Sequence, residues 1–281
     1  MEWVTRRGDP VPPLGQGTWK MGEGSERARE VKVLQAGIDR GLTLIDTAEM
    51  YADGGAERVV GEAVAGRRDE VFITTKVWPT HATRAGVVAS VAASLKRLGT
   101  DAVDLTLLHW PSRDHPLEET VAGLLDCQTR GLTRHIGVSN FPRDLLREAR
   151  RLCDKIAVDQ VEYSLTARHA ELTLIPYAIA EQVALMAYSP LRHLVGAGAS
   201  AAGRRALAEV AARHGVSPEA VALAFVLRPE AGPMVTIPKT ARVEHLDQNR
   251  AALDLRLSPE DTALLAQAFP QPAQDLEIER F

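Results

Sequence analysis

Short apolar runs alternate along the chain with longer amphipathic stretches. Eight runs are nearly continuous in apolar residues, and each is followed by a segment with helical periodicity. The runs span residues 14–19, 42–48, 71–77, 102–109, 135–140, 157–163, 183–190 and 234–239. Unbroken apolarity is typical of strands that are buried on both faces of a parallel sheet. Eight strand–helix units in order predict an α/β fold, the closed (β/α)8 TIM barrel, with a doubly wound open sheet as the alternative.

The helical segments carry recognisable start and stop signals. Thr83 is placed to cap a helix that ends at Gly99, and four apolar residues three and four positions apart lie on one face of it. Those residues are Val88, Val91, Leu95 and Leu98. Two later helices are expected to begin at the Ser-Pro pairs 217–218 and 258–259, because proline in the first turn has no N–H to leave unpaired. The first residues read as a small hairpin with a Gly8-Asp9 turn, which we expect to cap the bottom of the barrel.

Composition narrows the class of protein. The 281 residues are 45% hydrophobic and 25% charged, which suits one domain over residues 1–281. The net charge of -4 gives no reason to expect a nucleic-acid partner. The longest apolar runs have about eight residues, against the roughly 20 that a membrane span needs. Two cysteines are too few for a disulfide-stapled secreted domain, so a cytoplasmic location is expected. The protein is also expected to be a monomer.

Polar residues end three neighbouring strands of the predicted barrel. Asp46 ends the second strand, Lys76 lies near the end of the third and His109 ends the fourth, while Tyr51 lies in the loop after Asp46. Active sites of such barrels lie at the carboxyl ends of the strands. Any one of these residues alone is as readily a cap or a structural residue. Four complementary titratable groups on one rim favour a catalytic site.

These four side chains suggest a division of roles. A buried Lys76 ammonium stays charged if Asp46 offsets the cost of its burial. A charged ammonium beside Tyr51 stabilises the phenolate, so we expect the pKa of Tyr51 to fall from its ordinary value of about 10. His109 is placed to donate a hydrogen bond to the same substrate oxygen. The predicted site transfers a proton to a carbonyl oxygen while another group supplies hydride to the carbonyl carbon.

The motifs that carry these residues resemble those of the aldo-keto reductase family over nearly the whole chain. The matching segments, one at each strand end, are "GLTLIDTAEMYADGGAERVVGEAV", "TTKVW", "DLTLLHWP", "HIGVSNF", "DQVEY", "MAYSPL" and "IPKT". The nearest likeness, on "LIDTAEMYADGGAE" and "GQGTW", is to the bacterial YeaE-type methylglyoxal reductase branch. The resemblance implies an NADPH-dependent carbonyl reductase in which Asp46, Tyr51, Lys76 and His109 form the catalytic tetrad and Tyr51 is the proton donor.

The resemblance also implies which residues hold an extended NADPH across the barrel mouth. The implied cofactor residues are Gly17, Thr18, Ser139, Asn140, Gln160, Tyr188, Ser189, Leu191, Lys239, Thr240, Arg242, His245, Gln248 and Asn249. No G-x-G-x-x-G follows a strand, so a Rossmann site is not supported. The small-residue run 195–203 is expected to fold over the diphosphate. His245 stands where the family often has an arginine for the 2'-phosphate, so use of NADH is an open alternative.

The substrate pocket is expected to have aromatic walls. Trp19, Trp78 and Trp110 each follow a strand end, and Glu49 and Met50 are placed in the same wall. Such a pocket suits small or aromatic aldehydes and 2-oxoaldehydes such as methylglyoxal, although packing in the core is the other role open to these rings. The chain after Phe269 is short, which predicts an open pocket.

Two other functions fit the same residues. A metal-dependent barrel hydrolase would use His109, His115, Asp46 and Glu162, but no H-x-H or H-E-x-x-H pair is present and no metal site is expected. A binding or sensor module with the reductase fold and little turnover is the other alternative.

Overall fold

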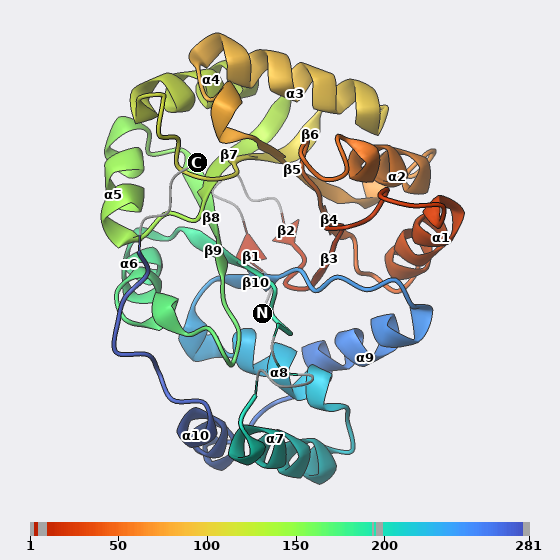
Figure 1. Ribbon diagram of the computed structural model, residues 1–281, viewed down its shortest axis with the longest axis vertical. Coiled ribbons are helices and arrows are strands. Elements are labelled where there is room, and N and C mark those ends of the chain that lie inside the picture. Colours follow the sequence, from red (N-terminus) through yellow and green to blue (C-terminus); the bar gives the residue numbers. More distant parts are fainter. Residues whose placement is uncertain (1–2, 5–9, 193, 195–198, 278–281) are drawn as a thin grey trace.

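Eight parallel strands form the centre of the molecule, and helices surround them (Figure 1). The structure is a computed structural model that describes residues 3–4, 10–192, 194 and 199–277. The strands are β3 (Gly15–Gly17), β4 (Leu44–Asp46), β5 (Phe72–Val77), β6 (Val103–Leu108), β7 (Thr133–Ser139), β8 (Ile156–Glu162), β9 (Ala184–Tyr188) and β10 (Met234–Thr236). They pair in sequence order, and a parallel bridge between Leu14 and Thr236 joins the first strand to the last. This closure confirms the barrel and excludes the open doubly wound sheet.

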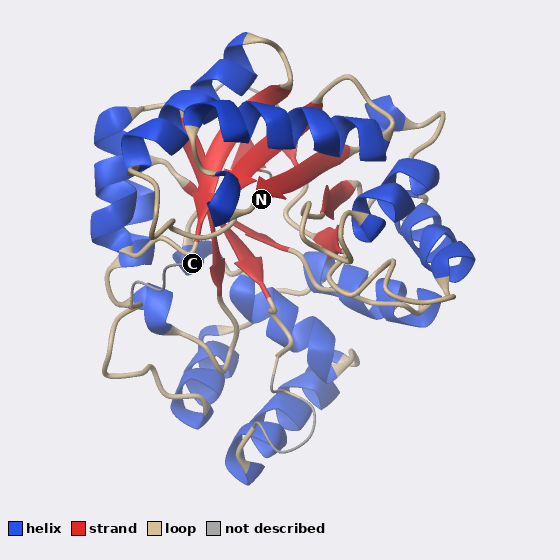
Figure 2. Cartoon of the chain, turned by 45° about the horizontal axis from the view of Figure 1, so that its top comes forward, coloured by secondary structure: helices blue, strands red, loops and turns tan. Residues whose placement is uncertain are grey.

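The helices form an outer layer around the barrel (Figure 2). They are α1 (Arg27–Ile38), α2 (Gly55–Ala63), α3 (Arg84–Leu98), α4 (Leu117–Thr129), α5 (Arg143–Leu152), α6 (Leu174–Glu181), α7 (Ala201–His214), α8 (Pro218–Val226), α9 (Val243–Asp254) and α10 (Pro259–Ala268). Single 3-10 turns are η1 (Arg68–Glu70), η2 (Pro79–His81), η3 (His169–Glu171) and η5 (Pro229–Ala231). Among the described residues, no helix is long and apolar enough to cross a membrane.

The predicted helix signals are confirmed by their hydrogen bonds. The Thr83 hydroxyl accepts the N–H of Gly86 at 3.0 Å, and Gly99 ends α3 in the left-handed conformation with φ 67°. Ser217 caps α8 in the same way, and Ser258 forms a complete capping box with Asp261 at the start of α10. Each cap satisfies backbone N–H groups that have no partner inside the helix, a contribution of about 1 kcal/mol.

Two segments differ from the prediction. The strand predicted at 234–239 ends at Thr236, because Pro238 has no N–H to continue the ladder. The run 195–203, predicted as a loop, contributes residues 201–203 to the first turn of α7, where the Ser200 hydroxyl accepts the N–H of Gly203. Residues 195–198 lie outside the described part of the chain, as does the predicted Gly8-Asp9 turn.

The amino-terminal hairpin is present and closes one end of the barrel. Strands β1 (Trp3–Val4) and β2 (Pro10–Val11) pair antiparallel and lie across the barrel centre (Figure 1). Val11 is buried in the apolar cluster that fills the barrel interior. That cluster comprises Val11, Leu44, Phe72, Leu105, Leu107, Ala157, Val158, Ala184, Met186, Val235 and Ile237. Apolar side chains therefore fill the barrel interior below the carboxyl ends of the strands.

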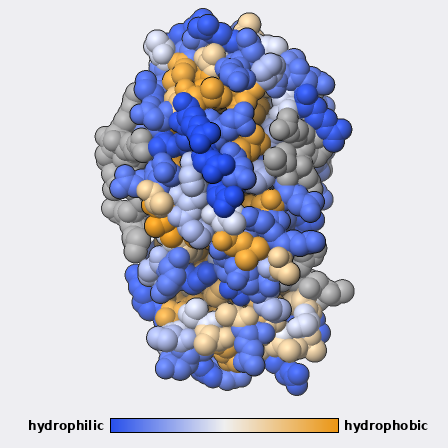
Figure 3. Space-filling view, turned by 90° about the vertical axis from the view of Figure 1, so that its left-hand side faces the viewer, coloured by the Kyte–Doolittle hydropathy of each residue, from blue (hydrophilic) through white to orange (hydrophobic). Residues whose placement is uncertain are grey.

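The outer surface beside α5 and α6 is mostly hydrophilic. Figure 3 looks at this side, and its hydrophobic residues form separate groups among hydrophilic ones. Leu152 and Ile179 are the exposed large hydrophobic side chains of α5 and α6. The described residues of this face therefore form separate apolar groups.

Asp159 is a buried acid on β8 with an incomplete set of partners. Its side chain is fully buried, and its Oδ1 accepts the N–H of Phe141 at 3.4 Å. Its Oδ2 has no hydrogen-bond partner within the described ranges. Burial raises the pKa of Asp159 well above its ordinary value, and the bond from Phe141 opposes this only in part. The folded state therefore favours the protonated acid.

Replacing Asp159 with Asn should make the stability of the protein less dependent on pH. The unfolded chain releases the Asp159 proton near pH 4, whereas the folded chain holds it to higher pH. The stability contributed by Asp159 is therefore complete below that pH and falls as the pH rises towards the folded pKa. Relative to the parent, Asp159→Asn should gain up to about 1.4 kcal/mol per pH unit over this window.

Urea unfolding between pH 4 and pH 8 measures this difference. Asp254→Asn, at a position whose side chain is 80% exposed, is the matched control and should follow the parent at each pH. A constant difference between Asp159→Asn and the parent across the range would show that Asp159 is ionised in the folded protein.

Candidate active site

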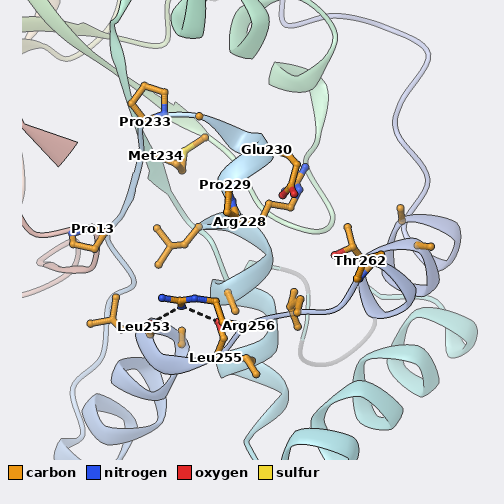
Figure 4. Close-up of a pocket in the computed structure, with 18 residues that line it drawn as sticks. Pro13, Arg228, Pro229, Glu230, Pro233, Met234, Leu253, Leu255, Arg256 and Thr262 are labelled. Atoms are coloured by element: carbon orange, nitrogen blue, oxygen red, sulfur yellow. Dashed lines mark hydrogen bonds between the residues drawn. The ribbon is translucent and has the colours of Figure 1, made fainter. Parts of the chain in front are cut away.

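Two large cavities lie at opposite ends of the barrel. The larger, of about 1070 Å³, is at the amino ends of the strands beside Pro13, Pro233 and Met234 (Figure 4). Its walls are mainly apolar, and the Arg256 guanidinium beside it donates to the carbonyls of Leu253 and Leu255. None of the four predicted catalytic residues lines it. The second, of about 830 Å³, is at the carboxyl ends of the strands and is lined by Asp46, Tyr51 and His109. Of the two, the second is the cavity whose described lining holds the predicted acid–base groups, at the end of the barrel where such sites lie.

Lys76 joins the predicted catalytic residues beneath the second cavity. Its Nζ lies 2.7 Å from Asp46 Oδ2 and 3.2 Å from the Tyr51 hydroxyl, and it donates to the Thr47 carbonyl at 2.8 Å. The Tyr51 and His109 rings meet edge to face with 5.6 Å between centroids. The structure therefore brings together all four residues, from β4, β5, the end of β6 and the loop after β4.

Burial and charge set the protonation of these groups. Burial is the largest influence on the pKa of Lys76 and lowers it, but the charges and hydrogen bonds of Asp46 and Tyr51 together outweigh burial. The pKa of Lys76 therefore lies above its ordinary value, and the ammonium is retained. Burial and the nearby Lys76 charge hold the pKa of His109 well below its ordinary value, so the imidazole is neutral near pH 7. A neutral imidazole has one N–H to donate to a ligand oxygen.

The expected fall in the pKa of Tyr51 is wrong for this structure. Burial raises the pKa of Tyr51, and Lys76 offsets only part of that increase. The charge of Lys76 is evident from the sequence, whereas the burial of the Tyr51 phenol, which raises its pKa, is not. Tyr51 is therefore a protonated phenol near pH 7 with a cation beside its oxygen, the state that a proton donor requires.

The floor of the cavity is a network of polar side chains. Gln160 Nε2 donates to Asp46 Oδ1 at 2.7 Å, and the Ser139 hydroxyl donates to the Gln160 carbonyl at 2.7 Å. Asn140 donates to the carbonyl of His109 and accepts the Tyr188 hydroxyl at 2.9 Å. Gln160 thus holds the second oxygen of the acid that pairs with Lys76, a link that the sequence did not reveal.

The comparison with known proteins agrees with this geometry. The model of the Aldo/keto reductase family matches residues 13–269. The chain belongs to the aldo/keto reductase family. It is 43% identical to methylglyoxal reductase YeaE of Escherichia coli over 93% of this chain and 92% of that protein. It is 32% identical to methylglyoxal reductase DkgB of Salmonella typhimurium over 91% of this chain and 92% of that one.

A solved aldo/keto reductase shares the whole fold. The crystal structure of the Klebsiella pneumoniae protein, in complex with NADP and acetate, is 39% identical and has a TM-score of 0.92 over 100% of both chains. Family membership confirms the resemblance seen in the strand-end motifs, the barrel, and a carbonyl-reducing enzyme as the class of protein.

Gly17, the last residue of β3, and Thr18, which follows it, have structural roles in this aldo/keto reductase. A Cβ on Gly17 would lie 2.7 Å from the Ile237 carbonyl oxygen, so a larger residue would push the first and last strands apart. The N–H and hydroxyl of Thr18 both donate to the Asp46 carbonyl, at 3.0 and 2.9 Å. Thr18 is fully buried and holds the main chain of Asp46.

The remaining predicted cofactor residues fall into two groups. Tyr188, Ser189, Leu191 and Lys239 line the cavity together with Ser139, Asn140 and Gln160. Thr240, Arg242, His245, Gln248 and Asn249 do not line it; they lie before or within α9, and Asn249 is buried. The Thr240 hydroxyl lies 3.3 Å from His245 Nδ1. Whether this second group binds a nucleotide stays a prediction.

Two charged residues of the cavity, Lys20 and Arg192, were not predicted at the site. Arg192 pairs at 3.1 Å with Glu162, which also lines the cavity and was predicted only for the metal-dependent hydrolase. Lys20 Nζ lies 4.8 Å from the centre of the Trp19 ring. Lys20 directly follows Trp19, one position beyond the residues that the strand-end pattern indicated. The partner of Arg192 is 30 residues away, and no local pattern identifies it.

Four residues predicted for the substrate wall lie at the cavity, and their contact with substrate stays a prediction. Trp19, Met50, Trp78 and Trp110 all line the cavity. Trp19 is 56% exposed and Met50 41% exposed, which contradicts a purely core-filling role for them. Glu49 does not line the cavity, so its predicted place in the wall is wrong. Its side chain turns the other way, towards η2 and α3.

The chain after Phe269 reaches the site, contrary to the expectation of an open pocket. Residues 274–277 line a side cavity of about 310 Å³ together with Trp110, Asn140 and Tyr188. His169 Nδ1 lies 2.8 Å from the Gln274 carbonyl, and the Thr173 hydroxyl donates to Asp275. The chain leaves α10, which packs beside α7, and then runs past α6 towards the site (Figure 1).

The proposed metal hydrolase finds no support. Across the described ranges, no group of three or more His, Cys, Asp or Glu side chains is arranged to hold a metal ion. Lys76 occupies the space between Asp46 and the rest of the site, and His115 lines a different cavity.

Lys76→Met should destabilise the protein more than the double change Asp46→Asn/Lys76→Met does. The single change leaves the Asp46 carboxylate buried without its cation, which costs about 3–5 kcal/mol. The double variant Asp46→Asn/Lys76→Met removes both charges and should recover much of that loss. Urea unfolding at pH 7 measures both, with Glu62→Ala in an exposed ion pair as the control. Equal loss in the single and double variants would contradict a buried, mutually compensating pair.

Proposed function

We propose that this aldo/keto reductase uses NADPH to reduce small 2-oxoaldehydes such as methylglyoxal, and aromatic aldehydes, to alcohols, with Tyr51 as the general acid. The observation that carries the proposal is the Tyr51 hydroxyl, 3.2 Å from the buried Lys76 ammonium beneath an aromatic-walled cavity. The similarity to two methylglyoxal reductases supports the substrate class.

The cavity suits a nicotinamide dinucleotide. Its floor carries hydroxyl and amide groups of Ser139, Asn140 and Gln160, whose positions are fixed by hydrogen bonds. Lys239 lies at its rim and forms no ion pair within the described part of the chain, so a cation is available for a phosphate. When bound, NADPH supplies hydride. Tyr188, whose hydroxyl is held by Asn140, would present its ring to the nicotinamide.

The protein's own groups would handle the carbonyl oxygen. The neutral His109 ring would donate a hydrogen bond to that oxygen and orient it towards Tyr51. Tyr51 would transfer its proton as the oxygen gains negative charge, and Lys76 would stabilise the resulting phenolate. Asp46 holds the Lys76 ammonium in place, and Gln160 and Thr18 hold Asp46.

The wall composition supports aldehydes with small or flat apolar groups. Trp19, Trp78 and Trp110 present ring surface to the cavity, and the exposed Met50 is an adaptable side chain that fills irregular gaps. Such walls exclude water from the reacting carbonyl and accept a planar ring.

The number of domains, the oligomeric state and the location of the protein are also proposals. We propose a single domain over residues 1–281 that acts as a monomer in the cytoplasm. The outer face beside α5 and α6 is mostly hydrophilic, which supports the proposal that this face binds no second copy of the chain (Figure 3). Cys127 and Cys153 are buried free thiols, which suits a reducing compartment.

Tyr51→Phe should retain NADPH binding and lose turnover by roughly 10²–10⁴-fold, because only the transferable proton is removed. The loss of NADPH absorbance with methylglyoxal or benzaldehyde measures turnover, and fluorescence titration measures cofactor affinity. Parent-like rates in Tyr51→Phe would contradict the proposed acid. A parent that binds NADPH tightly and reduces no aldehyde across a broad panel would favour the cofactor-binding module.

His245→Arg tests the choice between NADPH and NADH. Arginine is always charged and binds phosphate with two parallel hydrogen bonds, whereas histidine is only partly charged at neutral pH. The variant should bind NADPH roughly tenfold more tightly, as expected for one added charge-assisted hydrogen bond, with NADH affinity unchanged. Equal changes for both cofactors would place His245 away from the 2'-phosphate.

A further inference from the structure

Glu49 links three separate segments behind the substrate wall. Its Oε1 accepts the N–H of Trp78 at 2.6 Å and lies 2.9 Å from His81 Nδ1. Its Oε2 accepts the hydroxyl of the buried Ser90 on α3. Its own N–H donates to the Lys76 carbonyl at 3.3 Å. One carboxylate thus ties the loop after β4 to the turn after β5 and to a helix.

The two segments that Glu49 joins carry two rings that contact His109. Tyr51 follows Glu49 by two residues and meets the His109 ring at 5.6 Å between centroids. Trp78, whose N–H Glu49 holds, meets the same ring at 5.4 Å. Both contacts are edge to face. The Tyr51 hydroxyl is also held by Lys76 Nζ at 3.2 Å, so the contact that depends on Glu49 is the one between the indole and the imidazole.

The Glu49 side chain is shielded from water and lies outside the cavity. Only 10% of its side chain is exposed, so its bonds are shielded from water and hold their geometry better than surface bonds do. It is on the far side of the loop from the cavity and touches no part of the space a substrate would occupy. Any effect of Glu49 on the reaction must pass through the residues that it holds.

We propose that Glu49 is a positioning residue that sets the substrate wall by holding Trp78 against His109. The inference rests on the proposed carbonyl reduction at this site. Trp78 forms the wall for a flat ring, whereas a small 2-oxoaldehyde needs only the tetrad. Loss of Glu49 therefore lowers the activity with aromatic aldehydes more than the activity with methylglyoxal, and it weakens substrate binding more than cofactor binding.

A double-mutant cycle tests whether Glu49 acts through Trp78. In Glu49→Ala, KM for benzaldehyde should rise at least about fivefold while kcat for methylglyoxal stays within about twofold of the parent, since a misplaced wall affects the substrate that uses it. In the Trp78→Ala background, Glu49→Ala should change kcat/KM by less than about twofold, because two changes that act on one contact are not additive.

Three further variants isolate the interaction. Glu49→Gln keeps an acceptor for the Trp78 N–H and should restore the benzaldehyde KM. Glu49→Asp shortens the side chain and should change KM in the same direction as Glu49→Ala, which retains the test if the alanine variant folds poorly. Glu62→Ala removes an exposed ion-paired glutamate and should match the parent. Additive losses from Glu49→Ala and Trp78→Ala, or equal losses with both substrates, would overturn the proposal.

A measurement independent of turnover separates this inference from the proposed function. In protein labelled with 5-fluorotryptophan, Trp78→Phe identifies the Trp78 fluorine resonance. Glu49→Ala and Glu49→Asp should shift or broaden that resonance and leave the Trp19 resonance in place, and Glu49→Gln should not. An unmoved Trp78 resonance would refute the role of Glu49 even if the enzyme is active. A parent without aldehyde reduction would refute the proposed function, and the resonance would still decide the position of Trp78.

Discussion

The site depends on one buried pair of opposite charges, Asp46 and Lys76. An ammonium without exposure to water is tolerated only when an acid and further acceptors surround it. Asp46 and the Thr47 carbonyl provide those acceptors within 2.8 Å of Nζ. Because the pair lies directly below Tyr51, its charge distribution acts on the phenol oxygen and, through Lys76, on the His109 imidazole. The protonation of the four residues follows from their burial together with this contact.

The barrel makes that contact possible by fixing the order and register of neighbouring strands. Asp46 is paired in register with Thr74, two residues before Lys76 on the adjacent strand, and Lys76 is paired with Leu107, two before His109. Side chains two apart point to the same face of a strand, so the three groups rise in steps around the inner rim. Around this rim, Thr18 and Gln160 hold Asp46, and Glu49 holds the turn that carries Trp78.

The sequence predicted the features that have a local signal. Apolar runs and Ser-Pro or Thr caps gave the strands and helices, and polar residues at strand ends gave the tetrad and the aromatic wall. It could not predict contacts between distant segments. Gln160 is 114 residues from Asp46, and Arg192 is 30 from Glu162. The direction of Glu49 was predicted wrongly because a loop residue has no periodicity to indicate the face it occupies. The pKa of Tyr51 was predicted wrongly because desolvation depends on packing from several elements, which no motif records.

The measurement that tests the account most directly is the pKa of Tyr51 with and without the buried pair. With tyrosine labelled by ¹³C at Cζ, Tyr51→Phe identifies the Tyr51 resonance among the four tyrosines, and its pH titration reports the phenol alone. In Asp46→Asn/Lys76→Met, the account predicts a higher Tyr51 pKa than in the parent, because the favourable effect of the ammonium exceeds the unfavourable effect of the carboxylate. An unchanged or lower pKa in the double variant would contradict the claim that Lys76 stabilises the Tyr51 phenolate.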